Sequence, residues 1–234
     1  MAGWITHMRI ADEVLKRLPD LDKVGFCMGS IAPDCNVENG DWTAFTPPRE
    51  VTHWMNGENK LSADYEGFYC RYLAKKDGLS TQERSFYWGY IAHLMTDIAF
   101  FRFIHNEQLT EERWERICKI PGLMEKAHGQ PCSWENIKRI FGRKRVFAGL
   151  IALENEYLYG HPETAYLTVL QTVKDFPDYL DYLPRGAILR KIGVMGTVPE
   201  KHTGEIEQIF FTRTEMDGYI SRTCEEIIQY IKSK

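Results

Sequence analysis

Apolar residues recur three and four positions apart along nearly the whole chain, which is the spacing of amphipathic helices. Alternating apolar and polar runs between turn signals, which mark half-buried strands, are not convincing anywhere in the sequence. In a helix over residues 5–18, His7, Ile10 and Val14 share one face. The pattern therefore predicts an all-α multi-helix bundle in which His7 faces the core.

The same spacing predicts six further helices. The most apolar of them starts at Ser80, where Glu83 three residues on makes a capping box, and runs to residue 105. The predicted ranges of the others are 61–76, 110–120, 134–159, 163–175 and 213–231. Residues 19–60 are rich in Gly and Pro and are predicted to be irregular. Because long irregular segments inside a compact domain are usually functional, we expect this one to carry part of a site.

Length and composition indicate one ordinary globular domain. The chain has 234 residues, 44% of them hydrophobic, and shows no repeat or linker that would divide it. We therefore expect a single domain over residues 1–234. The oligomeric state is not fixed by any of these features.

Charge and apolar content bear on partners and location. The net charge of -4 disfavours long nucleic acid as a partner. The sequence has no run of about 18 apolar residues that could span a membrane, and residues 1–17 lack the pattern of a secretion signal. We therefore expect a cytoplasmic protein whose six cysteines, without any Cys-x-x-Cys pair, are reduced thiols.

His93 and Asp97 are the first candidates for chemistry. They lie one turn apart on the same face of the 80–105 helix, so both side chains can reach one ion. That face is otherwise apolar, and a buried carboxylate is costly unless a cation or hydrogen-bond donors compensate its charge. A metal ion would do so. The alternative is a buried polar pair in which Asp97 only orients His93.

Two further candidates lie in the Gly/Pro-rich segment. Asp34 closes the motif Gly-Ser-Ile-Ala-Pro-Asp, and His53 stands in Thr-His-Trp near the far end of the segment. Taken alone, Asp34 reads as a turn or cap residue and His53 as a cap or surface residue. Together with His7, His93 and Asp97, they make three imidazoles and two carboxylates, a donor set that suits zinc.

These motifs, in this order and spacing, resemble the zinc-dependent phospholipase C family, whose fold is shared with single-strand-specific zinc nucleases. The resemblance covers about the first 105 residues and includes Phe-Tyr-Trp-Gly-Tyr-Ile-Ala-His-Leu-Met-Thr-Asp, which ends at Asp97. It implies a helical bundle in which Asp34, His53, His93 and Asp97 hold one zinc ion, while His7 holds a second ion that Asp97 bridges. It also implies a zinc-activated water that attacks phosphorus, with Asp34 as general base, and a phospholipid or small phosphodiester as substrate.

The sequence departs from the family at the third zinc. Its usual ligands, a histidine about ten residues past His93 and a His-x-x-x-Glu pair, are missing, so one or two zinc ions are expected. The remaining candidates for a third site are His105, His128, Glu154, Glu156 and His161. Secreted members of the family also use the amino group of an N-terminal tryptophan as a metal ligand. Trp4 is not expected to bind metal in this way. Two alternatives stay open: a nuclease-like phosphodiesterase, and a non-catalytic metal-binding protein.

Overall fold

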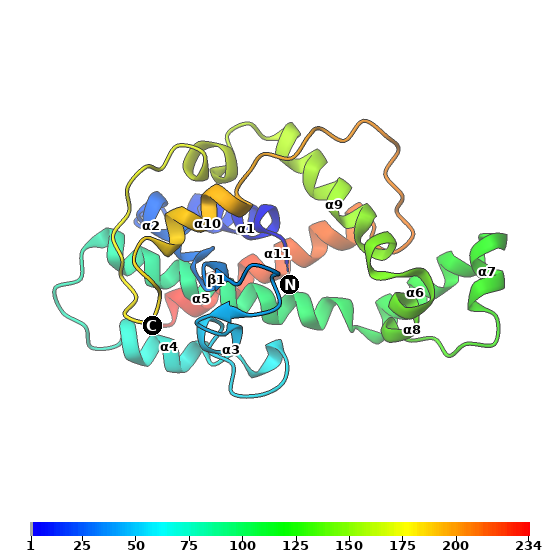
Figure 1. The fold of residues 1–234 in the computed structure, drawn as a ribbon, viewed down its shortest axis with the longest axis horizontal. Coiled ribbons are helices and arrows are strands. Elements are labelled where there is room, and N and C mark those ends of the chain that lie inside the picture. Colours follow the sequence, from blue (N-terminus) through cyan, green and yellow to red (C-terminus); the bar gives the residue numbers. More distant parts are fainter. Residues whose placement is uncertain (1) are drawn as a thin grey trace.

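The computed structural model describes residues 2–234, and nearly all of its regular structure is helical (Figure 1). The all-α prediction is confirmed. The α-helices are α1 (Trp4–Arg17), α2 (Lys23–Gly29), α3 (Arg49–Thr52), α4 (Tyr65–Tyr72), α5 (Thr81–Ile104), α6 (Glu107–Cys118), α7 (Pro121–Ala127), α8 (Trp134–Phe141), α9 (Arg143–Gly160), α10 (Ala187–Met195) and α11 (Arg213–Lys232). Single turns of 3-10 or π helix are η1 (Ala32–Asp34), η2 (Lys60–Ser62) and η3 (Tyr166–Leu170). The strands β1 (Val37–Glu38) and β2 (Phe45–Thr46) form a small antiparallel hairpin.

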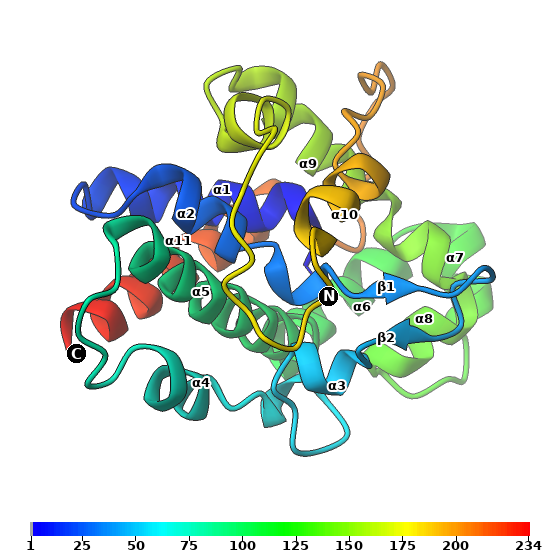
Figure 2. The same cartoon turned by 60° about the vertical axis from the view of Figure 1, so that its left-hand side comes forward.

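Helix α5 is the axis of the bundle. It starts as predicted, where the Ser80 hydroxyl accepts the backbone N–H of Glu83 at 3.1 Å. Its residues are apolar nearly all round, as expected of a helix covered on every side. Helices α1, α2, α4 and α11 pack against it, and α5 runs between α4 on one side and α1 and α2 on the other (Figure 2).

The prediction that residues 19–60 are irregular is wrong, because α2 forms within them and packs more extensively on α5 than any other element. Two glycines in seven residues lower the helix propensity of α2, so its stability comes from tertiary packing. Gly29 meets α5 where α5 itself has Gly89. A Cβ atom on Gly29 would overlap the carbonyl oxygen of Phe86, and one on Gly89 would overlap that of Phe26. The glycines therefore allow the two backbones to touch.

We expect Gly29→Ala to lower the free energy of unfolding by about 1–3 kcal/mol, the usual cost of overpacking a filled core. The added methyl group meets backbone atoms that cannot move unless the helices separate. Urea unfolding followed by circular dichroism measures this. Gly193→Ala in α10 is the matched control, since nothing lies within 4 Å of a Cβ atom there. Equal stability of the two variants would contradict the close approach of α2 and α5.

Other boundaries differ from the predictions for local reasons. Asn106 caps α6, so this helix starts before Thr110. Gly142, with a φ of 78°, separates α8 from α9 where one helix was predicted. The range 163–175 contains only the turn η3, and the range 61–76 only η2 and the shorter α4. Helix α10 was not predicted.

Helices α6, α7 and α8 gather at one end of the molecule, away from α2 and α4, in both views (Figures 1 and 2). Within residues 2–234, no helix combines the length and the apolar character that crossing a bilayer requires. The single domain and the cytoplasmic location stay predictions.

Candidate metal centre

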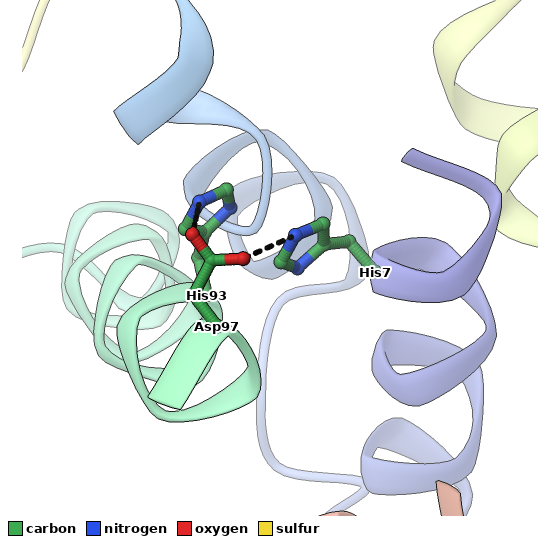
Figure 3. A group of neighbouring side chains, drawn as sticks. All are labelled: His7, His93 and Asp97. Carbon is green, nitrogen blue, oxygen red and sulfur yellow. Dashed lines mark ion pairs between the residues drawn. The ribbon is translucent and has the colours of Figure 1, made fainter. Parts of the chain in front are cut away.

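Helices α1 and α5 bring three of the predicted residues together. His93 and Asp97 project from α5 toward His7 on α1 (Figure 3). The Asp97 carboxylate reaches both imidazoles, with Oδ2 at 3.7 Å from His93 Nε2 and Oδ1 at 3.8 Å from His7 Nε2. The two rings stack with centroids 4.0 Å apart. One carboxylate thus faces two buried imidazoles.

Asp34 and His53 complete the cluster from the segment that precedes α4. Asp34 ends η1, and His53 caps the C-terminus of α3. His53 Nε2 lies 3.3 Å from Asp34 Oδ1 and 3.7 Å from Asp97 Oδ2. The hydroxyl of Tyr90 on α5 donates to the carbonyl oxygen of Thr52, which ties α3 to the central helix beside the site.

All five predicted residues are therefore neighbours, and all are buried. Asp34 is the most exposed at 8%, whereas the other four are at most 2% exposed. They form two overlapping groups whose donor atoms lie within 4.8 Å of one another: His7, His93 and Asp97 in one, and Asp34, His53 and His93 in the other. Their role as metal ligands stays a prediction.

Backbone carbonyl groups fix the tautomers of two histidines. His93 Nδ1 lies 2.8 Å from the carbonyl oxygen of Ser30, and His53 Nδ1 lies 3.0 Å from that of Arg49. Because a carbonyl oxygen only accepts hydrogen bonds, each Nδ1 carries a proton, and in the neutral imidazole each Nε2 then presents a lone pair. Both lone pairs point at carboxylate oxygens, so acceptors face acceptors. A cation between them removes this conflict, and histidine ligands of metals are commonly oriented in this way.

Buried polar atoms without hydrogen-bond partners also indicate a cation at this cluster. Nε2 of His7, His53 and His93 and Oδ2 of Asp97 are buried without a hydrogen-bond partner among the described residues. Such atoms are costly to bury, and native proteins rarely leave four of them together. Nitrogen and oxygen donors in this number suit zinc with a position left for water. The residues present thus fit the ion.

The family model for zinc-dependent phospholipase C matches residues 6–147, from α1 into α9. The chain belongs to this family. The matched range contains all five clustered residues, and the predicted resemblance is confirmed. The predicted cofactor, zinc, and the predicted phospholipase C-like class of hydrolase are confirmed with it. No curated protein and no solved structure matches the chain.

Of the five candidates for a third zinc site of the family, four make other contacts and one is exposed. His105 and His161 each hydrogen-bond to a carbonyl oxygen one turn earlier in their own segments. Glu156 pairs with Arg213 at 2.6 Å, His128 is exposed, and Glu154 accepts hydrogen bonds from Thr6. None of the five belongs to either of the groups that residues 2–234 form. The structure therefore offers no support for a third ion at these positions.

Burial and charge set the protonation of the cluster. Burial lowers the pKa of His7, and it lowers the pKa of His93 to about 3, so both imidazoles are neutral at pH 7. Burial alone would raise the pKa of Asp97, but His93 and the Lys60 ammonium outweigh it and hold that pKa below its usual range. The pKa of Asp34 is likewise held low against burial by the imidazoles of His53 and His93 that face it. The site therefore combines neutral His7 and His93 with ionised carboxylates, the forms that bind metal.

We expect the metal-free protein to lose stability as the pH falls below 6.5. Between pH 6.5 and about 3, His93 binds a proton in the unfolded chain but not in the folded one, so acid favours unfolding. His93 alone should lower the free energy of unfolding by roughly 2 kcal/mol between pH 7.5 and 5, at about 1.4 kcal/mol per pH unit below 6.5. Urea unfolding in chelator at both pH values measures it. Exposed His128→Ala should leave the difference unchanged, and equal stability at both pH values would contradict the buried neutral state of His93.

Two residues of the site were missed from the sequence. Lys60 Nζ lies 2.7 Å from Asp97 Oδ2, and Trp4 Nε1 donates to Asp34 Oδ2 at 3.0 Å. Trp4 stands three positions before His7 and so shares its helix face, which is a signal that could have found it. Lys60 lies in a polar stretch, Asn-Gly-Glu-Asn-Lys, that gives no such signal.

Proposed function

We propose that the protein hydrolyses a phosphodiester of the phospholipid type, with zinc held by His7, Asp34, His53, His93 and Asp97. One observation carries the proposal: the Nε2 atoms of His53 and His93 face the carboxylates of Asp34 and Asp97 and have no hydrogen-bond partner among the described residues. Family membership supports the substrate class. Zinc at this position would lower the pKa of a bound water toward about 7 and offset charge on the phosphate.

Asp34 is the residue we assign to the attacking water. It is the most exposed of the five carboxylate and imidazole groups, and Trp4 Nε1 fixes its Oδ2 atom. Because its pKa is held well below the usual range, its carboxylate is a weak proton acceptor at neutral pH. This favours a role in which Asp34 orients the water and holds the metal, rather than one in which it keeps the proton.

The test combines metal content with activity. Protein purified without chelator is analysed for metals and assayed on phosphatidylcholine and on bis(p-nitrophenyl) phosphate, before chelation, after it, and after zinc is restored. We expect bound zinc and hydrolysis that chelator abolishes and zinc restores. A single-stranded oligonucleotide tests the nuclease-like alternative in parallel. Zinc without hydrolysis of any diester would instead support the non-catalytic alternative.

A further inference from the structure

Lys60 reaches the cluster from an otherwise exposed loop. It begins η2 inside a turn that the bridge between Met55 and Ala63 closes, and residues 56–59 of this turn are exposed. Its side chain is only 16% exposed, and its Nζ atom is buried. A lysine in such a turn would ordinarily extend into water, so the inward direction needs a cause.

The cause is Asp97, and the contact is incomplete. Nζ lies 2.7 Å from Asp97 Oδ2, but no hydrogen bond of good geometry satisfies either atom within the described chain. An ammonium has three N–H donors, and a single carboxylate oxygen can accept at most one of them. Lys60 therefore brings to the cluster a positive charge with unused donors.

A metal ion would compete with Lys60 for the same atom. Asp97 Oδ2 faces Lys60 Nζ at 2.7 Å and the Nε2 atoms of His53 and His93 at 3.7 Å each. When the imidazoles are neutral, as metal ligation requires, two carboxylates and one ammonium give the cluster one net negative charge, and one divalent ion turns it positive. The ammonium is then repelled from Asp97, and its flexible four-carbon stem on an exposed loop allows it to move.

We infer that, in the metal-loaded protein, Lys60 binds a non-bridging phosphate oxygen of the substrate. The anion must approach the metal from the solvent side, and Lys60 enters the cluster from an exposed loop. A phosphodiester carries its charge on the two non-bridging oxygens, which accept the donors that Asp97 leaves unused. Lys60 is thus a substrate-binding residue for the phosphate group, and this inference rests on the proposed function.

The test uses Lys60→Met, which keeps the length of the side chain and removes its charge. The first measurement is zinc content and affinity, and the second is binding of inorganic phosphate to the zinc-loaded protein by calorimetry. We expect Lys60→Met to hold the same number of zinc ions at equal or higher affinity and to bind phosphate about tenfold more weakly, the effect of one charge-assisted hydrogen bond. Lys60→Arg should recover most of the phosphate affinity. Lys126→Met in α7, which removes an exposed lysine, is the matched control and should change neither quantity.

Three outcomes would overturn the inference: unchanged phosphate affinity in Lys60→Met, loss of zinc from that variant, or no phosphate binding by the zinc-loaded parent. Kinetics on bis(p-nitrophenyl) phosphate add a separate readout, in which KM should rise more than kcat falls. If the parent hydrolyses no diester but binds phosphate in a Lys60-dependent way, the proposed function fails and the assignment of Lys60 as a phosphate ligand stands.

Discussion

Asp97→Asn is expected to lower zinc affinity at least about a hundredfold, and hydrolysis should fall with the lost metal. Replacing a residue that only orients a metal ligand already costs roughly 10–100-fold in metal affinity. Asp97 lies at the centre of the cluster, so its loss should cost more. Its carboxylate faces His7, His53, His93 and Lys60, and asparagine keeps its size while removing the charge that offsets the ion. Competition with a zinc-binding dye measures the affinity.

The same substitution should also destabilise the metal-free protein, because it leaves the Lys60 ammonium buried without its anion. The cost is at most about 3 kcal/mol, since Lys60 can swing toward water. Adding Lys60→Met should restore this stability without restoring zinc affinity, which separates folding from metal binding. Asp217→Asn, which breaks an exposed pair with Arg9, is the control and should alter neither property. Full zinc affinity in folded Asp97→Asn would remove Asp97 from the ligand set.

Asp34→Asn is expected to reduce hydrolysis of a phosphodiester by roughly a hundredfold or more, the scale typical of losing a positioned acid–base group. Asparagine keeps the size of the side chain and one oxygen, which can accept from Trp4 Nε1 or bind the metal, but it loses the negative charge that faces His53. Initial rates on bis(p-nitrophenyl) phosphate measure the effect. Zinc must be quantified in the same sample, because a lost ion would produce the same fall.

The pH profile separates the two roles of Asp34. If the carboxylate accepts the proton, the acidic limb of kcat/KM should change in zinc-loaded Asp34→Asn. If it orients the water, as its lowered pKa favours, the profile should keep its shape while the rate falls. Activity at the parental level with zinc retained would exclude both roles.

The parts of the site that lie on long helices could be predicted from the sequence. His93 and Asp97 are four residues apart in a strongly apolar helix, so their common face and their burial follow from helix geometry alone. The Ser80 cap located the start of that helix. His7 was assigned to the core face of α1 in the same way. Periodicity was sufficient wherever the local pattern and the tertiary packing agree.

The remaining parts depend on contacts that no local pattern encodes. Asp34 and His53 read as ordinary turn and cap residues, and only the family resemblance placed them beside His93. Helix α2 was missed because its glycines argue against a helix, whereas the packing against α5 requires them. Lys60 was missed because a lysine in a polar turn normally faces water. Its inward direction arises from the charge of Asp97, a residue of another element.

The glycine contact between α2 and α5 also affects the position of a carbonyl group that binds His93. Ser30 directly follows Gly29, and its carbonyl oxygen is the atom that holds the proton on His93 Nδ1. The distance between the two helix backbones thus sets which nitrogen of the His93 imidazole carries the proton. A methyl group added at Gly29 or Gly89 would push this carbonyl away and release the ring to take the other tautomer. In this protein, two glycines on neighbouring helices therefore help to set the protonation of a predicted metal ligand.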